Sequence, residues 1–223
     1  MSSYLKQLRD EWRKIGSPQQ EGFHWSSCRK HWEAAFPEHI ELFQTLPLVL
    51  DRRSLREISE SPDAALLDKF LSIMIWGYSN RGYGPFRVRK MMSQPNFIEV
   101  LSEVFRLANL GKAKEAFTFL SENRINTLGP SYSSKIICFA TPREIGAPIY
   151  DSQVFSWLKE YASDSFGNLG NSPHKWDVEN YNHYWDWVKL NSIELACFPD
   201  EVELLIFRDS ESKAKSNSIW AKK

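Results

Sequence analysis

Apolar residues recur at helical spacing through most of this chain, and no segment keeps up the strict alternation of a half-buried strand. The clearest segment begins at Ser61-Pro62-Asp63, where a capping residue and a first-turn proline indicate a helix start. Its apolar face is formed by Leu67, Phe70, Leu71, Met74 and Ile75. The pattern predicts an all-α protein with this helix in its core.

Stop signals divide the rest of the chain into further helices. Gly111 ends a helix that starts near Ser93, and Thr141-Pro142 ends another over residues 131–140. Helices are also predicted over residues 112–123, from Asp151 onward, over 178–190 and over 200–207, with a surface loop at 163–173. We expect an N-terminal helical segment at 1–60, a main helical domain at 61–207 and a mobile polar tail at 208–223.

Charge and composition limit the partners of this protein. Its 223 residues include 28 basic and 28 acidic side chains, so the molecule as a whole does not attract nucleic acid, and a polyanion must be held locally. The start of the chain lacks the features of a secretory signal, and its apolar runs are far shorter than a membrane helix. Three widely spaced cysteines support neither a disulfide framework nor a metal site. We expect a cytoplasmic protein with no membrane contact, no metal and no cofactor.

A short link with a Leu128-Gly129-Pro130 corner joins the helices predicted within residues 112–140. Such a helix–hairpin–helix binds a DNA phosphate through backbone N–H groups at the hairpin and at the start of its second helix. The candidate DNA contacts here are Thr127, Leu128, Gly129, Ser131 and Ser133. Spacing alone leaves open an ordinary connection between two packed helices.

Several segments together point to one family. The run from Leu128 to Ala140 is followed by Ala147-Pro148-Ile149-Tyr150-Asp151-Ser152-Gln153-Val154, and Trp76-Gly77, residues 81–89 and residues 200–207 complete the pattern. The chain resembles the helix–hairpin–helix DNA glycosylase superfamily, specifically its bacterial 8-oxoguanine DNA glycosylase-like branch, over residues 66–207. The resemblance implies two packed helical subdomains with the active-site cleft between them and the hairpin at about 112–140.

The resemblance implies that Asp151 and Lys135 are catalytic. Asp151 matches the superfamily's catalytic carboxylate, which stabilises the positive charge that develops on the sugar as an N-glycosidic bond breaks. Strand-cutting members carry a lysine near Ser131, and Lys135 lies one turn later on the same face, where its long stem could bring the amine into the same cavity to form a Schiff base. The alternatives are an ordinary helix cap for Asp151 and a solvated lysine for Lys135. Thr127 stands where the superfamily hairpin usually has a glycine.

An extruded base needs a flat, partly apolar pocket. The aromatic candidates for its lining are Trp76, Tyr83, Phe86 and Phe155, each with an ordinary core position as the alternative. The segment from Asn80 to Met91 contains no acidic residue, and its arginines Arg81, Arg87 and Arg89 are candidates for contacting phosphates or the opposite-strand base. The alternative for this segment is a solvated loop.

These observations predict a monomeric DNA glycosylase that flips a modified base out of double-stranded DNA and cleaves its N-glycosidic bond. The resemblance favours 8-oxoguanine, with abasic-site lyase activity left open. A hypermodified base, as in some bacteriophage DNA, is the alternative substrate and would imply antiviral defence. The alternative functions are a non-catalytic helix–hairpin–helix DNA-binding protein and a helical protein-interaction domain. Asp151 argues against the DNA-binding module, because a carboxylate beside DNA repels the phosphate backbone.

Overall fold

The computed structural model describes residues 2–17, 22–79, 81–170, 172 and 174–216. Within these residues the regular secondary structure is helical, apart from a two-residue antiparallel pairing of β1 with β2 in which Phe23 lies opposite Leu50. The prediction of an all-α protein is therefore confirmed.

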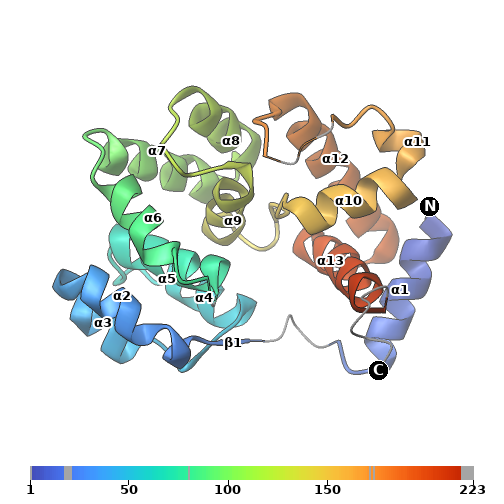
Figure 1. Ribbon diagram of the computed structural model, residues 1–223. Coiled ribbons are helices and arrows are strands. Elements are labelled where there is room, and N and C mark those ends of the chain that lie inside the picture. The colour runs from blue at the N-terminus through green and yellow to red at the C-terminus, as the bar shows by residue number, and fades with distance from the viewer. Residues whose placement is uncertain (1, 18–21, 80, 171, 173, 217–223) are drawn as a thin grey trace.

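The helices form two lobes (Figure 1). The first lobe contains β1 (Phe23–His24), η1 (Trp25–Ser27), α2 (Arg29–Ala35), η2 (Pro37–His39), α3 (Ile40–Thr45), β2 (Val49–Leu50), α4 (Arg52–Glu60), α5 (Leu66–Tyr78), α6 (Gly84–Met92), α7 (Phe97–Asn109), α8 (Ala113–Glu122) and α9 (Pro130–Ala140). The second lobe contains α1 (Ser2–Lys14), α10 (Ser152–Tyr161), α11 (Ser163–Phe166), α12 (Val178–Leu195) and α13 (Pro199–Ser216). The first helix of the chain thus belongs to the lobe that is otherwise built from the last helices.

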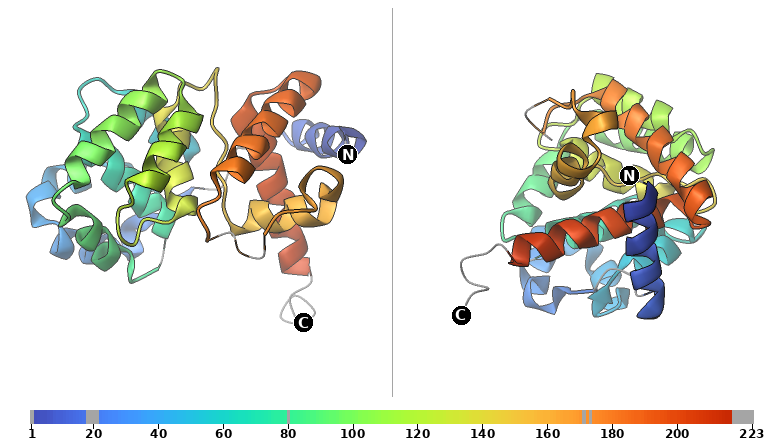
Figure 2. Two further views of the ribbon diagram at one scale, coloured as in Figure 1. Left: turned by 90° about the horizontal axis from the view of Figure 1, so that it is seen from above. Right: turned by 90° about the vertical axis from the view of Figure 1, so that its right-hand side faces the viewer.

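One helix is central to each lobe. In the first lobe α9 packs against α4, α5, α7 and α8, and in the second lobe α13 packs against α1, α10 and α12. Figure 2 shows α1 beside α13 in both views. The lobes also meet where Phe117 of α8 stacks on Tyr181 of α12, with ring centroids 3.9 Å apart. The contact between α8 and α12 therefore joins the two lobes.

Side-chain caps explain where three of these helices begin. Asp51 and Ser54 form a reciprocal capping box at α4, with Ser54 N–H 2.7 Å from Asp51 Oδ1 and Asp51 N–H 2.9 Å from Ser54 Oγ. Asp177 caps α12 by accepting the Asn180 N–H over 2.9 Å. Asp151 caps α10, as the sequence predicts.

The structure corrects several predicted boundaries. The core helix starts at Leu66 rather than at Ser61, because Ser61 terminates α4 and the Pro62-Asp63 link follows it. Part of the predicted 163–173 loop is the short helix α11, whose Phe166 is buried. The last helix runs to Ser216 instead of ending near Phe207, so the first part of the predicted mobile tail is helical. Residues 217–223 lie outside the described residues.

The Trp- and Tyr-rich helix is also longer than predicted. It runs as α12 from Val178 to Leu195 instead of ending near Leu190, and its C-cap Ala196 has left-handed backbone angles. In the described part of the chain, no helix combines the length and the apolar content that crossing a membrane requires.

Candidate active site

A cavity of about 870 Å³ lies at the junction of the lobes. From the first lobe it is lined by α5, α9, the hairpin before α9 and the segment around the start of α6, and from the second lobe by the start of α10 and by α13. Ile149 and Asp151 line it from the segment that connects the lobes. The cavity is large enough for a small-molecule ligand or an extruded nucleotide.

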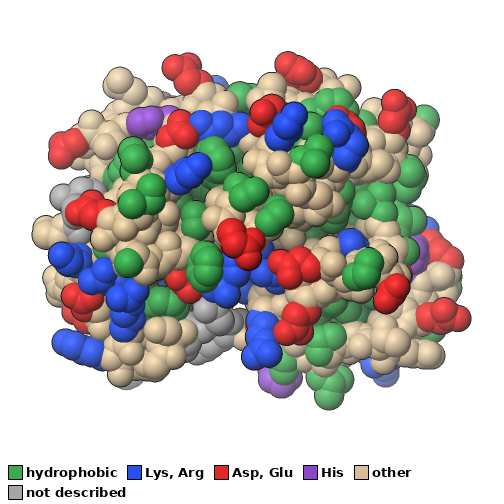
Figure 3. All heavy atoms as spheres, turned by 180° about the vertical axis from the view of Figure 1, so that it is seen from behind, with side chains coloured by type: hydrophobic (Ala, Val, Ile, Leu, Met, Phe, Trp, Pro, Cys, Tyr) green, Lys and Arg blue, Asp and Glu red, His purple; other side chains and the backbone are tan. Residues whose placement is uncertain are grey.

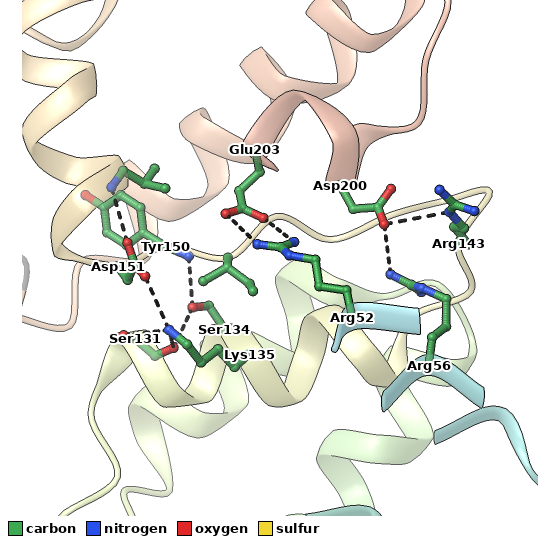
Figure 4. Close-up of polar contacts among 12 residues, drawn as sticks. Arg52, Arg56, Ser131, Ser134, Lys135, Arg143, Tyr150, Asp151, Asp200 and Glu203 are labelled. Carbon is green, nitrogen blue, oxygen red and sulfur yellow. Dashed lines mark hydrogen bonds and ion pairs between the residues drawn. The ribbon is translucent and has the colours of Figure 1, made fainter. Parts of the chain in front are cut away.

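The two oxygens of the Asp151 carboxylate have different partners. Oδ1 accepts the backbone N–H groups of Gln153 and Val154 over 3.1 and 3.2 Å, which caps α10 and fixes the side chain. Oδ2 lies 3.4 Å from Nζ of Lys135 (Figure 4). The carboxylate is thus held by the positive end of a helix while one oxygen faces the amine in the cavity.

Lys135 reaches Asp151 from α9. Only 8% of the surface of Lys135 is exposed, so the side chain is not that of a fully solvated lysine. Nζ lies 3.2 Å from Ser131 Oγ and 3.5 Å from the Ser131 carbonyl oxygen, so the amine returns along the helix to the position one turn earlier. The structure therefore brings together the two residues that the sequence singles out as catalytic candidates.

Gly77 of α5 makes room for this lysine. A Cβ at Gly77 would lie 3.1 Å from Cε1 of Tyr132 and 3.4 Å from Cδ of Lys135. The absence of a side chain therefore lets α5 approach α9 closely where the lysine stem passes.

The hairpin before α9 presents backbone rather than side chains to the cavity. Gly129 is extended, a Cβ on it would meet no atom within 4 Å, and both Gly129 and Ser131 line the cavity. Among the described residues, the N–H groups of Gly129 and Ser131 donate to no protein acceptor. Two unbonded donors at the start of a helix are suited to an anion.

Thr127 occupies the hairpin's left-handed position. Its φ is +72°, which is unusual for a β-branched residue and explains why related hairpins usually place a glycine there. Its Oγ1 donates to the Arg87 carbonyl oxygen over 3.3 Å and ties the hairpin to α6. Thr127 lines the cavity, whereas Leu128 is 3% exposed and Ser133 is fully buried, so the side chains of Leu128 and Ser133 are enclosed by the fold and do not line the cavity.

The four aromatic candidates separate into two groups. Trp76 and Tyr83 line the cavity. Phe86 projects from α6 with 73% of its surface exposed, and Phe155 is buried with its ring 6.2 Å from that of Tyr150. Phe86 and Phe155 therefore lie outside the cavity wall.

The arginine candidates also separate. Arg81 and Arg87 line the cavity, and the Arg87 guanidinium lies 4.9 Å from the centroid of the Tyr83 ring. Arg89 points away and pairs with Glu38 of η2 at 2.5 Å. Residues 80–91 include no acidic residue, but in the folded protein Glu38 supplies the acidic partner of Arg89. Most of this segment is the helix α6 rather than a loop, and Asn80 lies outside the described residues.

The sequence assigned no role to several residues of the cavity wall, and Tyr132, Arg52 and Arg208 are three of them. Tyr132 stacks on Tyr78 with centroids 4.3 Å apart, and the Lys135 amine lies 5.7 Å from its centroid. Arg52 lines the cavity and lies 5.9 Å from the Trp76 ring, and Arg208 of α13 lines it from the second lobe. Tyr132 could have been found from its place beside Lys135, whereas Arg52 and Arg208 have no local signal.

Charge is concentrated at the cavity although the molecule is neutral. Its described lining contains the cations Arg52, Arg81, Arg87, Lys135 and Arg208 against the acids Asp151 and Glu211, although the charge of Arg52 is already paired with Glu203. Figure 3, which shows the molecule from behind, has basic and acidic side chains side by side over most of the coloured surface, with a group of basic side chains at its lower left. The cavity therefore provides the local attraction that a neutral protein needs to hold a polyanion.

Beside the cavity, a ladder of ion pairs closes the lobe junction (Figure 4). Arg52 donates twice to Glu203, over 2.6 and 3.0 Å, in a pair with side-chain exposures of 6% and 0%. Arg56 lies 3.1 Å from Asp200, and Arg143 contacts both Asp200 and Glu201. Burial raises the pKa of Glu203, against the opposing attraction of the Arg52 charge. We call Arg52, Arg56, Arg143, Asp200, Glu201 and Glu203 the inter-lobe ladder.

Comparison with known proteins places the chain in a family. Residues 16–207 match the family described as "Putative 8-oxoguanine DNA glycosylase OGG-like protein". The chain belongs to this family. The match confirms the resemblance, extends it to α2–α4, and supports a DNA glycosylase in general. No curated protein and no solved structure matches the chain.

Proposed function

We propose that this protein excises a modified base from double-stranded DNA, with Asp151 as the catalytic carboxylate. The observation that carries the proposal is the placement of Asp151 and Lys135 3.4 Å apart on the wall of the cavity that also contains the hairpin residues Gly129 and Ser131. One cavity thus combines a fixed carboxylate, an amine and donors for a phosphate. The protein is expected to act as a monomer on DNA inside the cell.

The duplex would be held through its backbone. The N–H groups of Gly129 and Ser131 would bind one phosphate, and Arg81, Arg87 and Arg208 would neutralise its neighbours. These contacts carry no sequence information, which suits an enzyme that must examine many sites. The target base would rotate out of the stack into the cavity, beside the rings of Trp76, Tyr83 and Tyr132.

Cleavage of the N-glycosidic bond transfers its electron pair to the departing base and leaves positive charge on the sugar. Asp151 Oδ2 would stabilise that charge, and Oδ1 would keep the carboxylate in place through its two backbone donors. Removing a preorganised charge of this kind from an active site lowers the reaction rate by roughly 10²–10³-fold.

Lys135 would give the enzyme its lyase activity. Once the base has left, the Lys135 ammonium loses a proton, for which Asp151 Oδ2 is the neighbouring acceptor, and the free electron pair of Nζ attacks C1′. Nζ then loses a second proton to solvent, the protonated Asp151 gives its proton to the ring oxygen O4′, and the C1′–O4′ bond breaks to leave a Schiff base. Loss of a C2′ proton to solvent then expels the 3′ phosphate with its bonding electron pair by β-elimination, which cuts the strand. Ser131, which lies 3.2 Å from Nζ, would orient the amine.

The substrate favoured by the family is 8-oxoguanine, and a panel of duplexes tests it. Each duplex would carry one modified base, with hypermodified bases included, and mass spectrometry would identify the free base released. The key variant is Asp151→Asn, because Asn caps a helix about as well as Asp but has no charge. We expect it to bind DNA normally and to excise at least about 10²-fold more slowly.

Asp177→Asn is the matched control, because Asp177 caps α12 in the same way and does not line the cavity. It should excise at the wild-type rate. Near-normal excision by Asp151→Asn would refute the catalytic assignment. If wild-type protein binds the duplexes and releases no base, the non-catalytic DNA-binding function replaces the proposed one.

Borohydride tests the lysine separately. It should trap a covalent adduct with wild-type protein and none with Lys135→Gln, and the abasic strand should be cut without added alkali. Excision with no adduct and an intact abasic strand would make the enzyme monofunctional, and Lys135 would then have no role as a nucleophile.

A further inference from the structure

Two adjacent residues of α9 contact two adjacent residues of the segment that leads into α10. Lys135 Nζ lies 3.4 Å from Asp151 Oδ2, and one position earlier on each side the Tyr150 N–H donates to Ser134 Oγ over 2.9 Å. Both contacts join residues that are 16 positions apart. The backbone contact therefore sets the register in which the amine meets the carboxylate.

The Ser134 hydroxyl has a defined orientation. It is fully buried and donates its own proton to the Ser131 carbonyl oxygen over 3.0 Å, which directs a lone pair at the Tyr150 N–H. The same carbonyl oxygen accepts from Lys135 Nζ at 3.5 Å. One turn of α9 therefore holds both the hydroxyl that binds the Tyr150 backbone and the amine that faces Asp151, as Figure 4 shows.

The other end of this contact is held by the second lobe. The Tyr150 ring centroid lies 5.5 Å from that of Tyr184 and 6.2 Å from that of Tyr181, both on α12. The Tyr184 hydroxyl lies 3.4 Å from the carbonyl oxygen of Ile149. Ser134 thus ties α9 to a segment that the second lobe has already positioned.

We propose that Ser134 is a positioning residue that sets the distance between Lys135 and Asp151. It does not line the cavity, so it acts through its neighbours rather than on DNA. Without the hydroxyl the Tyr150 N–H has no acceptor, and residues 147–151 can shift relative to α9. This inference rests on the proposed function, because a shift of about 1 Å matters most where two groups must act on one atom.

The test compares Ser134→Ala with Ser72→Ala. Ser72 is the matched control, because it is also a fully buried helical serine that donates to a carbonyl oxygen of its own helix, Asp68 O at 2.7 Å, and it does not line the cavity. In single-turnover excision, Ser134→Ala should be slower by about 10- to 100-fold. Its Kd for duplex DNA should stay within about twofold of wild type, since no DNA contact changes. Ser72→Ala should change neither quantity.

Rates would be measured well below the melting temperature of each variant, so that lost stability alone leaves the rate per folded molecule unchanged. Hydrogen exchange at the Tyr150 amide and the ¹³Cε signal of labelled Lys135 report the geometry directly. In Ser134→Ala the amide should exchange faster and the lysine signal should move, and in Ser72→Ala both should match wild type. If Ser134→Ala does not fold, Ser134→Cys replaces it, because a thiol fills the site and accepts only weakly.

Unchanged exchange and an unchanged lysine signal in the Ser134 variant would overturn the inference, and so would a wild-type excision rate accompanied by altered signals. Failure of the proposed function has a different signature. If wild-type protein releases no base from any duplex, the function is wrong, and the exchange and the lysine signal still decide whether Ser134 holds the pair.

Discussion

The Arg52–Glu203 and Lys135–Asp151 pairs both join the first lobe to the second, in very different surroundings. Arg52 donates two bonds of 2.6 and 3.0 Å to a carboxylate with no exposed surface. Lys135 reaches Asp151 once, at 3.4 Å, and both of these residues line the cavity, whereas in the first pair only Arg52 does. In the first pair both carboxylate oxygens are bonded to the cation, whereas in the second one oxygen is held by the helix and the other faces the amine.

We infer from this difference that the first pair holds the two lobes in place and that the second pair takes part in the reaction. A doubled, buried pair fixes the relative position of two lobes, because breaking it leaves a charge without a partner in the interior. A single pair on a cavity wall can exchange its partner for a substrate at a lower cost. The inter-lobe ladder is therefore expected to determine stability, and the cavity pair to determine activity.

The largest expected effect on stability comes from breaking the ladder. Arg52→Met leaves Glu203 buried without its cation and should lower the free energy of unfolding by about 3–5 kcal/mol in urea denaturation. Lys135→Met should lower it by about 1 kcal/mol or less, because Asp151 keeps two N–H donors and a cavity that admits water. Equal losses in the two variants would erase the proposed distinction.

Glu203 should make the free energy of unfolding depend on pH. Burial raises its pKa, so above its ordinary value of 4.5 the folded protein retains a proton that the unfolded chain has lost. The free energy of unfolding should therefore fall as the pH rises from about 4.5 through the raised pKa, by at most about 1.4 kcal/mol per pH unit from this group.

Glu203→Gln should remove this part of the slope in urea denaturation at several pH values. Glu57→Gln, at an exposed position of α4, should keep the slope. A Glu203→Gln protein with the wild-type slope would contradict the assignment.

On the cavity side, Gly129→Val should weaken binding to every duplex by about tenfold, which is about 1.4 kcal/mol. A branched side chain obstructs the approach of phosphate to the hairpin, while the fold tolerates it because a Cβ at Gly129 meets no atom within 4 Å. Gly170→Val is the control, since Gly170 has the same open space and does not line the cavity. A binding loss confined to damaged duplexes would instead place Gly129 in the base pocket.

The smallest expected effect is at Thr127. Thr127→Gly relieves the left-handed strain at φ +72° and should raise the free energy of unfolding by about 0.5–1 kcal/mol, net of the lost bond to the Arg87 carbonyl. DNA binding should stay within about twofold in a band-shift titration, because the hairpin amides keep their places. A stability loss would show that the Thr127–Arg87 bond outweighs the strain.

The helix boundaries that sequence reasoning predicted correctly depend on neighbouring residues. Gly111 follows α7, Thr141-Pro142 ends α9 at Ala140, and Asp151 caps α10, because a glycine, proline or cap acts on the backbone beside it. Ser61-Pro62-Asp63 has the same local signature and was assigned wrongly. There the preceding helix α4 extends to Glu60 and uses Ser61 as its own end.

The end of α13 required contacts that are distant in sequence. Its polar C-terminal half predicts a mobile tail, yet Asp209 accepts hydrogen bonds from Tyr4 and from Trp157, and Lys213 bonds to both Asp209 and Tyr4. These partners come from α1 and α10, so no window of local sequence contains them. Tertiary contacts of this kind override a weak local preference.

For the site, the sequence by itself determined the helical class, the hairpin and the two residues that the structure places face to face, because caps, breaks and residue types are local properties. Only the tertiary structure decided that Lys135 turns toward Asp151, that Glu38 binds Arg89, and that Ser133 is buried. Helical spacing determines the direction of a side chain on its own helix, but not which element packs against that face. That choice depends on the packing of all the helices together, which also aligns Ser134 with Tyr150.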